Sequence, residues 1–221
     1  KQPVAAAGRS RDVLRCSDEE VIAFIQERHQ PHLLRCFSEI GLGFSQGRVV
    51  ADSETPQRIL NATKQRGEER MLRVIKLLAN PALFHECATH FMGNYGMQAL
   101  VEATLRIRQA IQLAAAQGQH ILSSFRSEHG GRDPHSVLLY ACLPAAVELS
   151  THERGTYLVQ KLAEEAEAGE LVELCRAVFP HGPSLTKDSK GVFVMMKLLG
   201  TLKDVCCEGS HRFDACELAD G

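Results

Sequence analysis

The sequence lacks a large excess of charge of either sign, because 25 Lys and Arg residues face 27 Asp and Glu residues, for a net charge of −2. A protein with this balance has no overall attraction for nucleic acid, so an RNA or DNA site must be local. The longest apolar stretch, 192–202, contains Lys197 and is shorter than the roughly 20 residues that cross a bilayer. We therefore expect no membrane-spanning segment and no membrane partner.

The eight cysteines lack the regular spacing of a disulfide framework. A chain of 221 residues can also bury a sufficient core without such crosslinks. We therefore predict reduced thiols in an intracellular, reducing compartment. Residues 1–7 have neither an initiator Met nor the apolar core of a signal peptide, which we interpret as a fragment or a processed chain.

Motifs that pair a nucleophile with a base, or that bind a phosphate in a glycine loop, are also missing. His85 and His90 come close to a zinc-protease motif, but His90 follows His85 by five positions, whereas the motif requires four. The cysteines from Cys206 onward lack the paired Cys-x-x-Cys spacing of a zinc knuckle. We therefore predict a protein that is not an enzyme, with no metal, no cofactor and no small-molecule substrate.

Helical periodicity dominates what is present. Apolar residues recur at i, i+3, i+4 and i+7 along most of the chain, without hairpin signals such as Asn-Gly, which predicts an all-α protein. Asn80 before Pro81 is a typical helix start, with the cap followed by proline at the first helical position. The expected helices span 18–28, 31–40, 56–65, 68–78, 81–91, 95–106, 107–116, 119–126, 135–149, 156–166, 169–179 and 192–202.

Many short helices suggest internal repeats, and one element does recur. In it, a small or turn-forming residue precedes a polar residue, a flat side chain, two apolar positions and a polar position. The copies, counted from the first polar position, begin at Gln57, Asn94, Gln119, Thr156 and Val192, at intervals of 37, 25, 37 and 36 residues. A copy at 131–135 would restore a 37-residue interval, but it places Pro134 inside a helix at a cost of about 3 kcal/mol. We therefore prefer the copy at Gln119.

Two segments, 93–102 and 155–162, resemble the second-helix signature of the Pumilio/PUF family of RNA-binding repeat proteins, and 190–199 is similar to a degenerate copy. The resemblance extends from about 56 to 202. It implies a right-handed α-helical solenoid, crescent shaped, built from three-helix repeats of about 36 residues. The expected division is an N-terminal helical segment or cap at 1–50, PUF-like repeats at 51–203, and a C-terminal cap or tail at 204–221.

The resemblance also implies binding to single-stranded RNA, one base per repeat, with two side chains on the base edge and a flat side chain stacking between them. The implied RNA-binding residues are Gln57, Arg58 and Asn61, then Asn94, Tyr95 and Gln98, then Gln119, His120 and Ser123, then Thr156, Tyr157 and Gln160, and finally Phe193. On a helix, Asn94, Tyr95 and Gln98 should project from one side. In this family, Asn with Gln around Tyr favours uridine. The last copy has no polar edge group, so Phe193 would only stack.

The family resemblance implies a role in post-transcriptional regulation in the cytoplasm, or in ribosome assembly in the nucleolus. The weak base code and near-neutral charge favour a member of a larger ribonucleoprotein assembly with protein partners. The alternative is a HEAT-like or tetratricopeptide-like scaffold that binds only protein, because any helical repeat needs tight turns and apolar spacing. A scaffold does not require the flat side chains found at the second position of every copy, which are Arg58, Tyr95, His120, Tyr157 and Phe193.

Overall fold

The computed structural model describes residues 17–26, 69–91 and 93–217, and every regular element in these ranges is a helix. The elements in chain order are α1 (Asp18–Gln26), a helix at 69–78, α4 (Pro81–Thr89), α5 (Gly93–Ala116), α6 (Ser123–Glu128), α7 (Pro134–Cys142), the 3-10 turn η2 (Leu143–Ala145), α8 (Ala146–Thr151), α9 (Gly155–Glu164), α10 (Ala168–Val178), η3 (Phe179–His181), α11 (Gly182–Leu185) and α12 (Gly191–Glu217). The predicted all-α class is confirmed for this part of the chain. The helices expected at 31–40 and 56–65 lie outside it.

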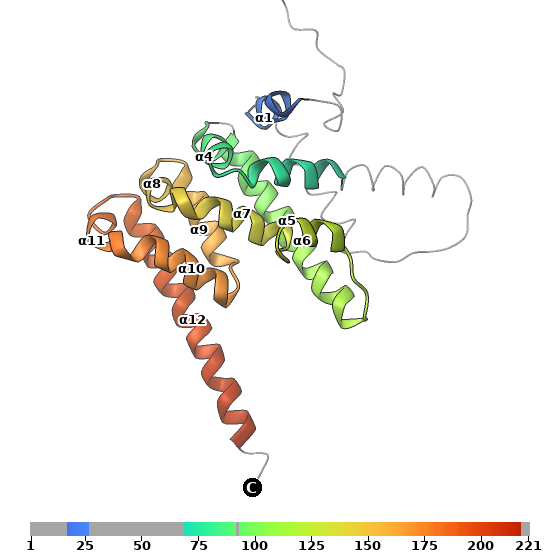
Figure 1. Ribbon diagram of the computed structural model, residues 1–221. Helices are drawn as coiled ribbons and strands as arrows, with labels where there is room; N and C mark the ends of the chain where they lie inside the picture. The colour runs from blue at the N-terminus through green and yellow to red at the C-terminus, as the bar shows by residue number, and fades with distance from the viewer. Residues whose placement is uncertain (1–16, 27–68, 92, 218–221) are drawn as a thin grey trace, which may run out of the picture.

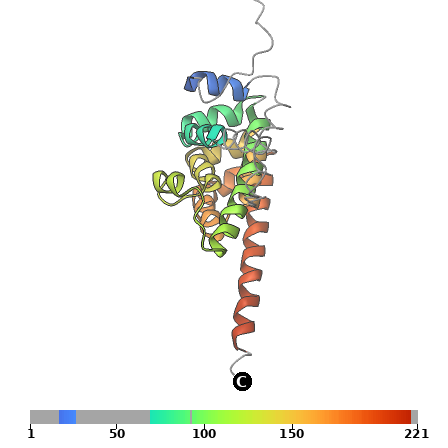
Figure 2. The same cartoon turned by 90° about the vertical axis from the view of Figure 1, so that its right-hand side faces the viewer.

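The described helices form successive units of three. The helix at 69–78 with α4 and α5 makes the first unit, α7 with α8 and α9 the second, and α10 with α11 and α12 the third. In Figure 1 the first helices of the units lie one below another, and the short helices α4, α8 and α11 follow down the left side. The third helices α5, α9 and α12 form the other layer, in which α9 packs against both of its neighbours (Figures 1 and 2). Each unit thus contributes its third helix to a common face.

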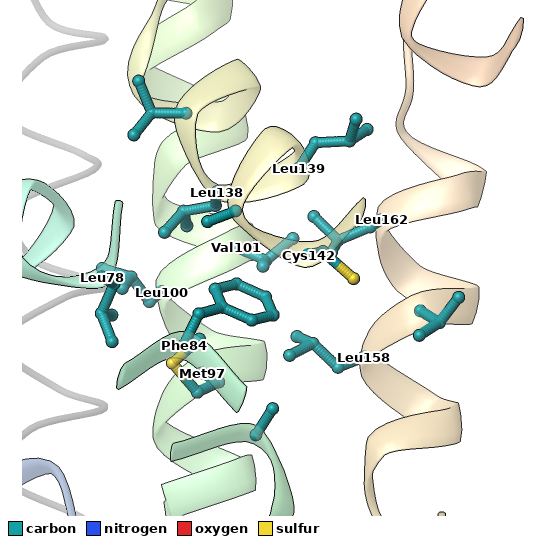
Figure 3. Close-up of a cluster of buried hydrophobic side chains, with 14 of the residues drawn as sticks. Leu78, Phe84, Met97, Leu100, Val101, Leu138, Leu139, Cys142, Leu158 and Leu162 are labelled. Atoms are coloured by element: carbon teal, nitrogen blue, oxygen red, sulfur yellow. The ribbon is translucent and has the colours of Figure 1, made fainter. Parts of the chain in front are cut away.

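The first two units share one hydrophobic core, shown in Figure 3. Phe84 of α4 lies among Met97 of α5, Leu138 of α7 and Leu158 of α9, and all four side chains are fully buried. Each such side chain contributes about 1.5–3 kcal/mol when it leaves water. The units therefore depend on one another for their stability.

Each third helix begins with a glycine that touches the backbone of the preceding helix. A Cβ on Gly93, Gly155 or Gly191 would lie 2.6, 2.9 or 2.7 Å from the carbonyl oxygen six residues earlier. The side chain three residues before each glycine accepts a hydrogen bond from the glycine N–H, and these caps are His90, His152 and Asp188. The recurrence of glycine in the sequence element therefore has a steric cause at all three junctions.

We predict opposite effects for two Gly→Ala substitutions on α12. Gly191→Ala places a methyl group 2.7 Å from the Leu185 carbonyl oxygen, so it should destabilise the protein by about 1–3 kcal/mol. Gly200→Ala, on the same helix with no atom within 4 Å, should be neutral or stabilise by up to about 1 kcal/mol. Urea unfolding of both variants measures the difference. Equal stabilities would contradict the close contact at Gly191.

The interval between the first and second units is longer because α5 is a single helix of 24 residues. The predictions of separate helices at 95–106 and 107–116 were therefore wrong. Gly93 and Gly155 are 62 residues apart, yet α5 packs directly against α9, with no further third helix between them. The C-terminal half of α5 together with α6 is an insertion between two adjacent units, rather than a missing repeat.

Other boundaries also differ from the sequence predictions. The single helix expected at 135–149 is divided into α7, η2 and α8, because Pro144 falls within η2 and cannot continue a regular helix. The last helix was expected to end at 202, but α12 continues to Glu217 as one helix. Its C-terminal half projects from the rest of the molecule (Figures 1 and 2).

A buried ion cluster fixes the insertion in place. Arg108, on the extended part of α5, is only 5% exposed and donates to Asp133 at 2.8 Å and to Glu170 at 2.9 Å. Asp133 is the N-cap of α7, and Glu170 belongs to the capping box of α10. Burial would raise the pKa of Glu170, but hydrogen bonds from Arg108 and Ser136 outweigh burial and lower it. One guanidinium thus ties α5 to the starts of two later helices.

His135 of α7 lies fully buried next to this cluster, with Nδ1 3.2 Å from the Thr104 hydroxyl. Burial is the main cause that lowers the pKa of His135 to about 4, and the positive charge of Arg108 adds to it. The carboxylates of Asp133 and Glu170 act in the opposite direction but do not outweigh burial. His135 is therefore a neutral side chain of the folded core at neutral pH.

We predict that acid destabilises the protein well before its carboxylates titrate. Between pH 7 and pH 5 the unfolded chain protonates His135, whose ordinary pKa is near 6.5, while the folded chain does not. Stability should therefore fall by about 2 kcal/mol over this range, as urea midpoints measured against pH would show.

The control for this prediction is His135→Leu, because Leu171 is buried at the corresponding place 36 residues later. This variant should lose most of the dependence on pH between 7 and 5, and His129, whose pKa is also lowered mainly by burial, contributes to the rest. A pH profile that the substitution leaves unchanged would refute the assignment to His135.

Candidate nucleic-acid interface

Three aromatic side chains occupy the same position on the third helices of the units, α5, α9 and α12. Tyr95, Tyr157 and Phe193 each lie two residues after the first glycine of α5, α9 and α12, and they are 56%, 56% and 50% exposed. The residues one and three positions after Tyr95, which are Gly96 and Gln98, are buried and half-buried, so the aromatic ring is the outermost group of its turn. Because α9 packs against both α5 and α12, the three rings belong to one face. We call this the aromatic face.

The structure does not place the expected edge groups beside these rings. Asn94 is only 3% exposed, and its amide nitrogen donates to the carbonyl oxygens of Ala88 and Arg154. Its side-chain oxygen accepts from Gln98. The expectation that Asn94 projects with Tyr95 and Gln98 was therefore wrong, because its amide hydrogens bind α4 of the same unit and Arg154 of the next unit.

The same arrangement recurs on α9. Thr156 is 1% exposed, and its hydroxyl accepts from Gln160 at 3.1 Å. Gln98 and Gln160 are both half-buried and both donate inward through Nε2. Among the expected edge pairs of these two helices, their side-chain carbonyl oxygens and the second hydrogen of each Nε2 remain for a ligand.

The third helix has the composition expected from sequence. Val192 is half-buried, Met196 is 54% exposed, and neither offers a polar group near Phe193. Leu199 lies one turn further along and is also exposed. The face therefore becomes more apolar toward α12.

Ion pairs between charged side chains connect α9 to α5 and α12 to α9. Lys161 of α9 pairs with Glu102 of α5, and Lys197 of α12 pairs with Glu164 of α9 at 3.2 Å. Each pair joins the seventh residue of one third helix to the tenth residue of the third helix of the preceding unit. These lysines therefore link the units and are partly neutralised, which limits the attraction of the face for phosphate.

One cation lies against an aromatic ring at the edge of the face. The Arg154 guanidinium carbon is 4.7 Å from the centre of the Phe91 ring, and Phe91 is 58% exposed. Such a pair contributes about 0.5–1 kcal/mol at an exposed site. Neither residue was among the expected RNA-binding residues, because neither type recurs in the other units. Glu153 and Ser189 stand at the positions that correspond to Phe91, and Lys190 stands at the position that corresponds to Arg154.

The expected copy at Gln119 does not belong to this face. Gln119 and His120 lie in the turn between α5 and α6, and Ser123 is the first residue of α6. In Figure 2, α6 lies on the opposite side of the molecule from α12. The repeat alignment failed here because α5 continues past its expected end and moves the next helix out of register.

The alternative copy at 131–135 is not a third helix either. Pro134 is the first residue of α7, where proline is tolerated, and Asp133 caps this helix through the Ser136 N–H. The copy expected from Gln57, Arg58 and Asn61 lies outside the described residues.

Within residues 17–26, 69–91 and 93–217, no three His, Cys, Asp or Glu side chains gather as a metal site would require. Among the helices of this part of the chain, none is long and apolar enough to cross a membrane.

No family model, no curated protein and no solved structure matches this chain.

Proposed function

We propose that this chain is a divergent PUF-like α-helical solenoid that binds single-stranded RNA without catalysing a reaction. The observation that carries the proposal is the repetition of an exposed flat side chain at one position of three adjacent helices, as Tyr95, Tyr157 and Phe193. Stacking on an aromatic ring contributes about 1–3 kcal/mol per base and tolerates every base. Three such rings are suited to three nucleotides of an unpaired strand.

Base selectivity in this proposal is weak. Asn94 and Thr156 are bound within the protein, so the base edges meet chiefly the side-chain amides of Gln98 and Gln160. A carbonyl oxygen accepts from the N3–H of uracil and also from the amino groups of other bases. We therefore expect uridine-containing strands to bind, with modest preference over other single strands.

The biological setting that we propose is post-transcriptional regulation or the assembly of a ribonucleoprotein. Lys161 and Lys197 are paired with carboxylates, which reduces the positive charge that α9 and α12 offer to phosphate. Affinity for RNA alone would then be moderate, and partner proteins in the assembly would share the binding.

Direct binding to labelled RNA tests the proposal. Fluorescence anisotropy of the full chain with a uridine strand of about eight nucleotides, compared with a duplex of equal length, should show preference for the single strand. Because few phosphates are neutralised, the affinity should fall by less than about ten-fold between 50 and 200 mM salt. The proposal fails if the single strand does not bind at 50 mM salt, or if the duplex binds better.

A protein-binding scaffold is the second candidate, and the apolar part of the aromatic face favours it. Phe193, Met196 and Leu199 are each at least half exposed on one side of α12. Aromatic and Met side chains are enriched where proteins meet. Under this hypothesis the full chain does not bind RNA, and a partner protein covers Tyr95, Tyr157 and Phe193.

A further inference from the structure

A second apolar surface lies at the end of the third unit, away from the aromatic rings. Its groove, with a volume of about 430 Å³, is lined by Val172, Cys175, Arg176, Phe179, Pro180 and Leu202. Five of these six side chains are apolar, and Val172 is 41% exposed. We call this surface the end groove.

The internal repeat shows what covers the equivalent surface one unit earlier. The turn η2, with Leu143 and Pro144, precedes η3, with Phe179 and Pro180, by 36 residues. The helix α10 of the following unit packs against η2 and α8. The surface of η2 that corresponds to the end groove is therefore an interface with an amphipathic helix.

The path of the chain after α9 differs from its path at the corresponding point of α12. After α9 ends at Glu164, a short link leads into α10, whose start is fixed by the capping box of Glu167 and Glu170. At the corresponding point α12 does not end but continues to Glu217, and it leads away from the other helices (Figures 1 and 2). Within the described part of the chain, no helix takes the place over η3 that α10 takes over η2.

We propose that the end groove is the docking site for an amphipathic α-helix of a partner protein, bound as α10 is bound to η2 and α8. The residues that α10 buries give the chemistry of this partner. Leu171, Leu174 and Val178 are fully buried and follow the spacing i, i+3 and i+7 of one helix face. The partner helix therefore carries a stripe of medium-sized aliphatic residues at this spacing.

A peptide of residues 166–181 is the probe, because α10 is the helix that binds the equivalent surface. A covalent staple between positions 172 and 176, which are exposed on α10, keeps the peptide helical, as circular dichroism verifies. Fluorescence anisotropy should show saturable binding of the labelled peptide to the full chain. The same peptide with Leu171→Asp and Leu174→Asp should not bind.

Val172→Asp in the full chain locates the site, because Val172 is exposed and its replacement leaves the core intact. A charge in the docked interface should weaken peptide binding about ten-fold or more, while RNA binding stays unchanged. The proposal is overturned if the helical peptide does not bind, or if Val172→Asp binds it as well as the natural chain. It is also overturned if sedimentation shows a dimer of the chain that Val172→Asp dissociates, since a second copy then fills the groove.

Discussion

The double variant Tyr95→Ala/Tyr157→Ala should lose at least about 30-fold in affinity for a uridine-rich single strand, while remaining folded. Each ring removed costs about 1–3 kcal/mol of stacking, and these two rings lie on helices that pack against each other. Both side chains are more than half exposed, so their removal should change the free energy of unfolding by no more than about 0.5 kcal/mol. Anisotropy titrations and thermal unfolding measure the two effects separately.

Two matched controls make this result specific. Tyr95→Phe/Tyr157→Phe keeps the flat rings and should bind nearly as well, because Phe193 already has that side chain at the third position. Leu113→Ala removes an apolar side chain that is 62% exposed on the distal part of α5, and should leave RNA binding unchanged. If the alanine and phenylalanine double variants bind RNA equally, stacking on these rings is not how the chain binds RNA.

The variant Arg108→Met should show the largest loss of stability of the substitutions considered. It leaves the buried carboxylates of Asp133 and Glu170 without their cation, and breaking a buried ion pair in this way costs about 3–5 kcal/mol. For a chain of this size the expected fall in the unfolding temperature is about 10 °C. Differential scanning calorimetry measures it.

An exposed arginine provides the comparison. Arg176 pairs with Glu173 one turn away on α10, so Arg176→Ala should cost at most about 0.5 kcal/mol. The triple variant Arg108→Met/Asp133→Asn/Glu170→Gln removes the unpaired charges and should recover part of the stability lost in Arg108→Met. If Arg108→Met and Arg176→Ala are equally stable, the cluster does not hold the insertion as the geometry indicates.

Local sequence patterns predicted the helices and the outward position of the aromatic rings. Periodicity identified the helical class, and Asn80 with Pro81 marked the start of α4 correctly. The recurring glycine followed by an aromatic residue marked the starts of α5, α9 and α12. These features depend on groups within one or two helical turns, so the local sequence contains the information that determines them.

Local sequence patterns did not predict contacts between residues that are far apart in the chain. Asn94 is buried because the Arg154 carbonyl, 60 residues later, accepts its amide hydrogen, and no local spacing shows this. Likewise, α5 continues past Arg106, where a break was expected, and its Arg108 binds Glu170, which lies 62 residues further on. The expectation that Asn94 projects outward beside Tyr95 was wrong for this reason.

The sequence alone determined which segments are helical and which side chains stand at each helix start, because hydrogen bonds and steric contacts within a few residues decide both. The tertiary structure decided that α5 and α9 are neighbours, that Lys161 and Lys197 are paired, and that η3 lies uncovered in the described part of the chain. Packing between units determines these features, since burial of apolar and charged groups depends on which distant helices meet.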